Sequence, residues 1–596
     1  MAWRTFVRVI VPSRKGFNFF SKNFQEHLFF LLAPILLYPR KAPNCRHMEP
    51  LMSEQNDRAE IQRIAHALQQ AELADDMLGQ VQLYERLAAI TPQVALIHAK
   101  LGHLHLRLKQ PQAARAHIEK ALSMPGDDKV DAEIFDRMAE ATEFSDQLAQ
   151  ARTWYQQRPN LWRFKLYINA LQSAQQNEEA EKLLLETLQG KLDASQQTWI
   201  LCALSKLYFD TGRYHDCIAC CQLGLEASPD DVRLHFNMAT ALEQVARYED
   251  AFRHYQVVLD KDPQHVGTHN NLGLLMLRLK EFEAGWPHYE WRWPASQQNQ
   301  QQVFNIPQWQ GEPLQGKSLL VWAEQGIGDH IMFASMLPSL LALGGRICFE
   351  SYARLDPILN RSFPQVEFIR REQSGTVNDG VQMLYRQNWP RCDFHIPMGS
   401  LGRWLRPDLP SFASPSGYLK ADQAGAQAKR EEYSKLFPGK RLIGLSWRGG
   451  TNVSNDMQSR RITMSELARL SSLPGVQFIN LQYGDTLLER YEAQILGLNI
   501  HHDPSVDPLT SMDAQANQLA ALDTVLSIDN TTVHLAGALG IPTYVLLQLN
   551  PNWRWALNDS QSYWYPSVHL VRNLEIGRWG NVLDKAVTAM RDNGHL

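Results

Sequence analysis

The chain has 596 residues, too many for a single hydrophobic core, so two or more domains are expected. Apolar residues make up 44% and charged residues 20%, as in ordinary globular proteins, and a formal charge of −4 argues against general nucleic-acid binding. The seven cysteines are too few and too irregularly spaced for a disulfide framework. We therefore expect a cytoplasmic protein that has no nucleic-acid partner and contacts the inner membrane at most peripherally.

Residues 1–53 form a basic and apolar N-terminal extension. Its apolar run, Leu28–Tyr38, is interrupted by Pro34 and falls well short of the ~20 residues needed to span a bilayer. A signal peptide is poorly formed, because the basic lead is long and no clear small-residue cleavage site follows. Two interpretations stay open: an interfacial anchor, or a non-native start with Met48 or Met52 as the true first residue. We favour the second.

Residues 54–295 contain an internal repeat with a step of 34 residues. Positions that keep this step are Leu204, Met238 and Leu272; Tyr208, Leu242 and Met276; Cys217, Ala251 and Gly285; and Pro229 and Pro263. Such a period, with small residues where paired helices meet and prolines after each second helix, is typical of helical solenoids.

This segment resembles the tetratricopeptide repeat, with five to seven units and degenerate ones near residues 129–196. The resemblance implies a concave surface that binds a protein partner or an extended peptide. A spacer or a dimerisation element is the alternative. Cys217, Cys220 and Cys221 suggest a metal site at first, but no second thiol or histidine pair follows at zinc-like spacing. We interpret these cysteines as helix packing.

The repeat array ends in an aromatic stretch, Glu281–Trp293. So many aromatic side chains in a short segment predict a packed seam rather than a free repeat end. Residues 296–316 are then expected to form a linker, which is rich in Gln and Asn at its start.

From Lys317 onward, short apolar runs alternate with helical stretches. Runs of strand length stand at 318–322, 346–350, 366–369 and 392–396, and again at 442–447, 476–481, 524–528 and 543–547. Strand–turn–helix–strand order is typical of parallel α/β sheets. The sequence therefore predicts an α-solenoid followed by two doubly wound lobes, 317–430 and 431–596, that bind ligands at their facing carboxyl edges.

A glycine-rich turn, Gln325–His330, follows the first predicted strand. Gly326 and Gly328 allow a tight turn, and Asp329 precedes a helix expected over residues 331–343. Asp329 is either the N-cap of that helix, a role worth about 1 kcal/mol, or a functional carboxylate. The turn alone does not decide between these roles.

The most specific motif spans residues 527–542. A predicted strand ends at Asp529, the hydroxyl residues Thr531 and Thr532 follow, and His534 lies one turn into a helix of small residues. The unsatisfied N–H groups at such a helix start form a natural cradle for a diphosphate.

A third group of candidates is cationic and aromatic. Arg448 follows Trp447 at a strand end, with Arg460 and Arg461 downstream, and cations there suit a pyrophosphate leaving group. A solvated surface pair is the alternative for the two downstream arginines. The aromatic clusters 552–555 and 563–566 either stack on a base or sugar or pack in a core.

Together these motifs resemble glycosyltransferase family nine, the heptosyltransferase-like enzymes, and especially their tetratricopeptide-fused relatives, over about 317–580. The resemblance implies the two-lobed GT-B fold, with the acceptor at the first lobe and the nucleotide sugar at the second. It also implies a catalytic base at Asp329 and contacts to the donor diphosphate and nucleoside from Asp529 and His534.

This chain departs from the family pattern at two points. Asn530 stands where the family has threonine, although Thr531 and Thr532 could supply the missing hydroxyl. The family's donor-side lysine has no obvious counterpart, so Arg448 or Arg461 would substitute. These departures leave the donor's identity open.

The function expected is a hexosyl- or heptosyl-type, nucleotide-sugar-dependent glycosyltransferase that acts on a hydroxyl of a protein or glycan. The implied reaction is inverting and metal-independent, with no cofactor, and the repeats recruit the acceptor or a protein partner. The alternative is a catalytically inactive repeat scaffold that carries a transferase-like domain. Beside Asp329 as base, the expected donor-binding residues are Gly326, Gly328, Trp447, Arg448, Arg461, Gln482, Asp529, Asn530, Thr531, Thr532 and His534.

Overall fold

The structure is a computed structural model that describes residues 49–74, 76–108, 110–124, 148–157, 159–295, 304–371, 389–412, 417–449, 461–574 and 579–596. The chain divides into two compact units, Met1–Gly190 and Lys191–Leu596, and each is described by itself. Residues 1–48, residues 125–147 of the degenerate repeats, residues 296–303 of the predicted linker, and Arg460 lie outside the described residues.

The first unit is helical. Gly102 shows why small residues stand where paired helices meet: a Cβ atom there would lie 2.5 Å from Cγ1 of Ile118 on the facing helix. The helices of this unit are α2 (Glu49–Leu73), α3 (Met77–Ile90), α4 (Ala95–Arg107), α5 (Pro111–Ser123), α7 (Leu148–Gln157), α8 (Leu161–Ser173) and α9 (Asn177–Leu188).

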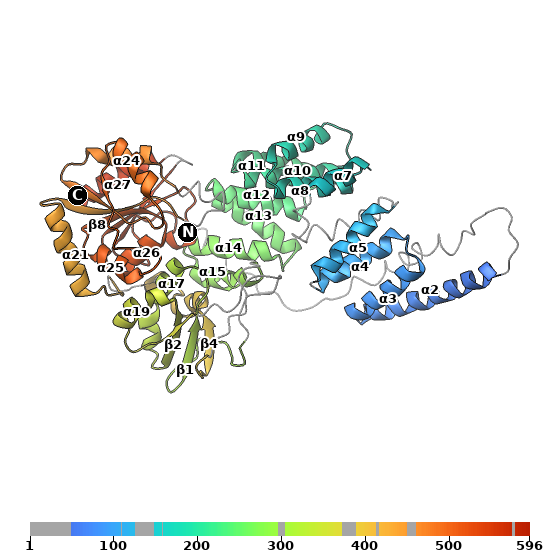
Figure 1. Ribbon diagram of the computed structural model, residues 1–596, viewed down its shortest axis with the longest axis horizontal. Helices are drawn as coiled ribbons and strands as arrows, with labels where there is room; N and C mark the ends of the chain where they lie inside the picture. Colours follow the sequence, from blue (N-terminus) through green and yellow to red (C-terminus); the bar gives the residue numbers. More distant parts are fainter. Residues whose placement is uncertain are drawn as a thin grey trace. The chain divides into compact units, whose positions relative to one another are not determined.

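The second unit begins with three helix pairs that lie side by side (Figure 1). They are α10 (Ala194–Asp210) with α11 (Tyr214–Ala227), α12 (Val232–Gln244) with α13 (Tyr248–Lys261), and α14 (Val266–Arg278) with α15 (Phe282–Tyr289). A left-handed residue stands two positions after the end of the first helix of each pair. These residues keep the step of 34; they are Gly212, Ala246 and Lys280, with φ of 77°, 59° and 66°. The carbonyls of Tyr208, Leu242 and Met276 accept the bonds that close these turns, as in Schellman caps.

Histidine pairs also follow the repeat. His235 and His269 on the first helices bond through Nδ1 to Nδ1 of His254 and His288 on the second helices, each at 2.8 Å. Nε2 of His235 lies 2.9 Å from the carbonyl of Pro229, which can only accept, so Nε2 is the donor in that contact. Burial first, and then the neighbouring histidine, lowers the pKa of His254 and His288 to about 4. His254 and His288 are therefore neutral, and the pairs pack within the array.

The cysteines of α11 also pack inside the array. Cys217 and Cys221 are buried, and the Cys217 thiol lies 3.9 Å from the backbone oxygen of Asn237 on α12. This position agrees with the predicted packing role.

The first lobe contains a parallel sheet in the order β3-β2-β1-β4. Val321 on β1 lies opposite Phe349 on β2 and Ile396 on β4, so β1 and β4 end side by side. The strands are β1 (Ser318–Trp322), β2 (Arg346–Ser351), β3 (Glu367–Arg370) and β4 (Phe394–Pro397), and the α-helices are α17 (Ile327–Ala334), α18 (Leu337–Leu341), α19 (Asp356–Ser362) and α20 (Gly402–Leu405).

The second lobe contains a six-stranded parallel sheet in the order β10-β9-β8-β5-β6-β7. Ser446 on β5 lies opposite Ser527 on β8, so these two central strands end together. The strands are β5 (Arg441–Ser446), β6 (Val476–Asn480), β7 (Ile500–His501), β8 (Thr524–Ile528), β9 (Thr543–Leu547) and β10 (Val568–Arg572). The α-helices are α21 (Gln423–Leu436), α23 (Met464–Leu467), α24 (Leu487–Ile495), α25 (Met512–Ala520), α26 (Thr531–Ala538) and α27 (Gly580–Asp592).

The predicted two-lobed α/β fold is thus confirmed by the two parallel sheets. In each sheet the strand order reverses direction at one point, between β1 and β4 in the first lobe and between β5 and β8 in the second. In open parallel sheets, ligands bind outside the carboxyl ends at this switch point. Across the described residues, none of the helices combines the length and apolar character that a bilayer crossing requires.

Candidate functional site

Asp329 lies in the first turn of α17, which begins earlier than the sequence predicted. Gly326 is the N-cap and makes no side-chain capping bond, so the interpretation of Asp329 as the N-cap is wrong. Instead, the Asp329 carboxylate accepts a hydrogen bond from the guanidinium of Arg554 in a short 3-10 helix, η7 (Trp553–Trp555), of the second lobe. Gln325, the first residue of the turn, has a left-handed φ of 57°, which is strained for a side-chain-bearing residue.

The turn that holds Asp329 packs directly against the start of α26. A Cβ atom at Gly328 would lie 2.9 Å from Cδ2 of His534 and 3.6 Å from the hydroxyl of Thr531, so only glycine allows this approach. The two motifs predicted from distant parts of the sequence therefore lie side by side, one from each lobe (Figure 1). Thr532, by contrast, is buried.

His534 is a buried, neutral imidazole. Its Nδ1 lies 2.8 Å from the hydroxyl of Tyr565, and its ring stacks on Trp555 with centroids 5.3 Å apart. Burial first, and then the charge of Arg554, lowers the pKa of His534 well below its usual value. The imidazole can donate or accept hydrogen bonds but supplies no positive charge.

The carboxyl ends of β5, β6 and β8 meet at a network centred on Gln482. The Oε1 atom of Gln482 accepts from the hydroxyl of Ser446 (3.0 Å) and from the backbone N–H groups of Trp447 (3.0 Å) and Arg448 (2.9 Å). Its Nε2 is buried and has no hydrogen-bond partner among the described residues. An unpartnered donor at the switch point is available to a ligand.

Asn530 is the N-cap of α26, which gives a local reason for its departure from the family's threonine. Its side-chain oxygen accepts from the backbone N–H of Thr532 at 3.0 Å, and its amide donates to the Ser446 hydroxyl at 2.7 Å. Asp529, one residue earlier, is buried at the end of β8. Gly449 passes close by, since a Cβ atom there would lie 3.1 Å from the Asp529 carbonyl.

Arg448 and Arg461 come together at the edge of this network. They form an isolated antiparallel bridge, and both guanidinium groups lie 3.2 Å from the same oxygen of Glu489 on α24. The Arg461 side chain is 57% exposed. Trp447 is wholly buried in the core of the second lobe, which places its ring away from solvent.

The switch point of the first lobe is occupied by the repeat array. Arg292, on the short helix α16 (Arg292–Ala295), forms a double hydrogen bond with Glu324 (2.9 and 2.8 Å) and donates to the hydroxyl of Ser400 at 2.9 Å. Glu324 also accepts the backbone N–H of Gly399 at 2.8 Å. Burial alone would lower the pKa of Arg292, but Glu324 more than reverses this and raises it.

The predicted aromatic seam is confirmed around Trp286. The Trp286 indole lies against Gly402, where a Cβ atom would be 2.4 Å from the ring, and donates to the carbonyl of Arg406 at 2.8 Å. Tyr289 accepts a hydrogen bond from Gln325 at 2.7 Å, and both aromatic rings pack on Trp553 of the second lobe. The last repeat is therefore built into both lobes.

A groove of about 480 Å³ runs along α10, α12 and α14 to the second lobe. Its end is formed by Asn550, whose side chain accepts from Arg278 at 2.6 Å. Other lining residues are Lys206, Phe209, Asp210, Phe236, Asn237, Thr240, Glu243, Gln244, Asn271 and Leu274.

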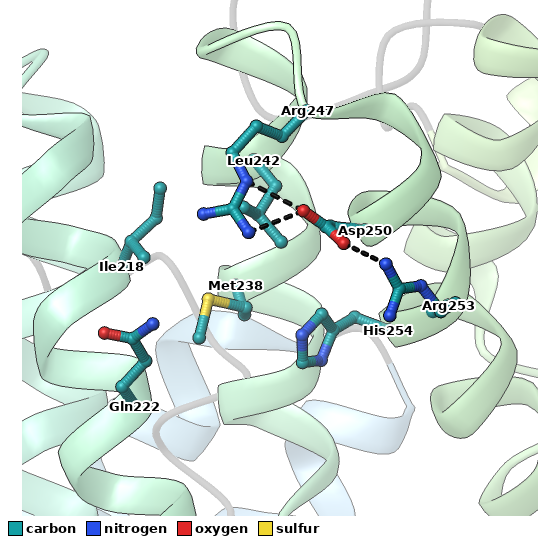
Figure 2. A pocket seen from close by; sticks show the side chains of 8 residues that line it. All are labelled: Ile218, Gln222, Met238, Leu242, Arg247, Asp250, Arg253 and His254. Atoms are coloured by element: carbon teal, nitrogen blue, oxygen red, sulfur yellow. Dashed lines mark hydrogen bonds and ion pairs between the residues drawn. The ribbon is translucent and has the colours of Figure 1, made fainter.

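Figure 2 shows a smaller pocket, of about 240 Å³, whose lining residues come from α11, α12 and α13 and include Arg247, the N-cap of α13. Its wall is apolar at Ile218, Met238 and Leu242, and Asp250 pairs with both Arg247 and Arg253. Among the residues that the structure describes, none from either lobe lines this pocket.

Sequence reasoning missed two charged groups of the site, Arg554 and Glu350. The sequence indicated Arg554 only as a member of the aromatic cluster 552–555. The tryptophans on both sides of it were the available signal that its side chain is buried. Glu350 stands at the end of β2, where its carboxylate accepts the backbone N–H of Ala323 at 2.7 Å. Burial raises the pKa of Glu350 to about 7, partly offset by that bond and by Arg371.

Comparison with a family model supports the repeat part of the chain. The tetratricopeptide repeat family matches residues 95–128 and 200–231, which confirms the predicted repeats. Protein FlbA of Caulobacter vibrioides is 33% identical over 300 residues, which are 48% of this chain and 49% of that protein. The chain thus spans about half the length of this curated relative.

Solved structures similar to this chain include two sugar transferases. The family 9 glycosyl transferase from Veillonella parvula is 12% identical, covers 47% of this chain and 98% of its own, and superposes with a TM-score of 0.33. The ADP-heptose lipopolysaccharide heptosyltransferase II of E. coli is 13% identical, covers 46% and 99%, and has a TM-score of 0.29. The family indicated by the sequence motifs is thus represented among these structures.

Proposed function

We propose that this protein is a glycosyltransferase that moves a sugar from a nucleotide-diphosphate sugar to a hydroxyl group of a protein or glycan. The observation that carries the proposal is the meeting of Asp329 with the start of α26. A carboxylate from one lobe and an anion-binding helix start from the other stand together beside the carboxyl ends of two parallel sheets.

In this proposal the reaction is a single displacement with inversion that needs no metal. Asp329 takes the proton from the acceptor hydroxyl as its oxygen attacks the anomeric carbon. The bond between that carbon and the diphosphate oxygen breaks, and the electron pair leaves with the diphosphate. The start of α26 and the hydroxyl of Thr531 stabilise the charge that develops there.

The nucleotide part of the donor is assigned to the second lobe, where the amide nitrogen of Gln482 is buried without a partner among the described residues. The acceptor, or a protein that presents it, is assigned to the groove along α10, α12 and α14. This groove ends at Asn550, four residues before the arginine that contacts Asp329. Polar and aromatic side chains along it suit an extended peptide.

The second candidate function is a repeat scaffold with an inactive transferase-like domain. One observation favours it: the carboxylate of Asp329 is engaged by Arg554 rather than left open to an acceptor.

A nucleotide-binding experiment separates the two candidates. We expect one or more of a panel of nucleotide sugars to raise the melting temperature of the full chain and to be hydrolysed slowly. Asp329→Asn should lower transfer by roughly 10²–10⁴-fold, the usual contribution of a general base, without loss of nucleotide binding. If no nucleotide sugar stabilises the protein, the scaffold function is the correct one; if Asp329→Asn turns over at the wild-type rate, Asp329 is not the base.

A further inference from the structure

Arg554 is a buried cation placed between the acidic residues of the two motifs. It is 9% exposed, its guanidinium donates to Asp329, and its Nε has no partner in the part of the chain that the structure describes. Burial alone would lower the pKa of Arg554, but the carboxylates of Asp329 and Asp529 raise it. The guanidinium thus bonds to the acceptor-side base, and the charge of Asp529 at the donor-side strand end also acts on it.

The backbone that carries Arg554 is held firmly. The carbonyls of Trp555 and Ala556 accept from Arg572 at 2.6 and 3.3 Å, and Trp553 packs against rings of the last repeat. Ala556 has a left-handed φ of 54°, a conformation that is kept only when its surroundings impose it. A change of partner by Arg554 is therefore a movement of its side chain, not of the segment.

We propose that the ion pair between Asp329 and Arg554 locks the catalytic base, and that the diphosphate of the donor opens the lock by taking Arg554 for itself. This inference rests on the proposed transferase function and adds its regulation. While Asp329 accepts from Arg554, one of its oxygens is occupied and its negative charge is compensated, which makes it a poor acceptor for the proton of a hydroxyl.

The exchange follows from charge and geometry. A diphosphate carries more negative charge than one carboxylate and offers paired oxygens that match the guanidinium fork. It would be bound at the start of α26, whose Thr531 lies beside the Asp329 turn. Arg448 and Arg461 engage Glu489 rather than Asp329, so their transfer to a diphosphate would not free the proposed base.

The lock gives the reaction an order. Donor binding moves Arg554 to the diphosphate without breaking a covalent bond and leaves Asp329 free for the acceptor proton. During transfer, the new carbon–oxygen bond forms as the bond to the diphosphate breaks, and Arg554 meets the charge on the leaving group. The donor therefore binds before the acceptor is activated.

The test measures the affinity of the full chain for inorganic pyrophosphate and, separately, for ADP, GDP, UDP and CDP by calorimetry. We expect Arg554→Gln to weaken binding of those ligands that the wild type binds by roughly 10- to 100-fold, the loss of a charge-assisted bond. The affinity of Arg554→Lys should lie between those of the wild type and Arg554→Gln. Asp329→Asn should tighten binding roughly 3- to 10-fold, because Arg554 no longer has to break an ion pair with a carboxylate before it binds the ligand.

The double variant Asp329→Asn/Arg554→Gln sharpens the test. Since Asp329 affects the affinity for these ligands only through Arg554, the double variant should bind them as tightly as Arg554→Gln alone. Arg469→Gln is the matched control, since Arg469 forms an exposed ion pair with Asp584 in the same lobe. If Arg554→Gln does not fold, as judged by its melting curve without ligand, the Asp329→Asn measurement decides alone.

The results distinguish the lock from the transferase function itself. Equal affinity of wild type and a folded Arg554→Gln, or weaker or unchanged binding by Asp329→Asn, overturns the lock and leaves the transferase proposal standing. Absence of any pyrophosphate or nucleotide binding by both wild type and Asp329→Asn overturns both.

Discussion

The two lobes share a strand order around their switch points, but those points are used differently. In the first lobe, the carboxyl ends of β1 and β4 enclose Glu324 and Ser400, and Arg292 of the repeat array binds both. In the second lobe, the ends of β5 and β8 carry Ser446 and Asn530, and the neighbouring Gln482 keeps an amide nitrogen without a partner among the described residues.

The difference favours the second lobe as the binding site for the nucleotide in the proposed reaction. At the position where an open parallel sheet usually binds a ligand, the first lobe binds a side chain of its own chain. In the proposed reaction, its contribution would then be the turn with Asp329. The second lobe keeps its switch point for a ligand, which is why we assign the nucleotide there. Three predictions test this contrast.

The largest expected effect is on stability, from Arg292→Met. This change leaves Glu324 buried and unpaired, which costs about 3–5 kcal/mol, so the melting temperature of the full chain should fall by roughly 5–10 °C. Calorimetry measures it. Arg213→Met is the control, because Arg213 and Asp216 form an exposed ion pair whose loss costs less than about 1 kcal/mol. A melting curve of Arg292→Met that coincides with the control's would show that Arg292 does not hold the first lobe's switch point.

A smaller effect is expected at Gln482, where two substitutions separate stability from binding. Gln482→Leu removes the acceptor of three hydrogen bonds and should cost about 1–3 kcal/mol. Gln482→Glu keeps an acceptor oxygen there but replaces the unpartnered N–H donor by an oxygen. It should melt closer to wild type while its affinity for the nucleotide falls roughly tenfold.

Gln477, on β6, the strand that ends two residues before Gln482, provides the control for this pair of variants. It is also buried, and its amide donates to the carbonyls of Phe478 and Asn499. Gln477→Glu should lower the melting temperature without changing nucleotide affinity. The assignment of the nucleotide to the second lobe's switch point fails if Gln482→Glu binds as tightly as Gln477→Glu.

The parts predicted from the sequence are those encoded by local spacing. The step of 34 reappears in the left-handed residues Gly212, Ala246 and Lys280, because each repeat must turn at the same place. Strands β1 and β9 have the predicted bounds, since 319–322 and 544–547 are continuous apolar runs. Strand β7 was missed because it has only two residues, and β10 because its polar and apolar residues alternate near the end of the chain.

The charged contacts of the site could not be predicted in the same way. Asp329 and Arg554 are 225 positions apart, and nothing in the sequence near either residue names the other. Their pairing depends on how closely the lobes approach, which is set at Gly328 by packing against His534. Arg292 likewise looks like one charge in an aromatic stretch, and its partner Glu324 lies in another domain of the sequence. Motifs predict which residues act, whereas tertiary packing decides their partners.

The smallest expected effect is a pH dependence at the first lobe's edge, from Glu350→Gln. In the folded protein the pKa of Glu350 is raised to about 7, because burial disfavours its charged form. The folded state therefore holds this proton more tightly than the unfolded state. The stability that this provides is complete below about pH 4.5, the ordinary glutamate range, and is lost as the pH rises through about 7.

Glutamine has the same shape, can accept from Ala323, and does not titrate. Glu350→Gln should therefore melt close to wild type at pH 5 and a few degrees higher than wild type at pH 8. Glu367→Gln on β3 is the control, because Glu367 is about half exposed. The difference in melting temperature between this variant and wild type should not increase from pH 5 to pH 8. A constant difference between Glu350→Gln and wild type from pH 5 to pH 8 would mean that water reaches Glu350. The sheet edge of the first lobe, beside the switch point that Arg292 occupies, would then be as accessible to water as the corresponding edge of the second lobe.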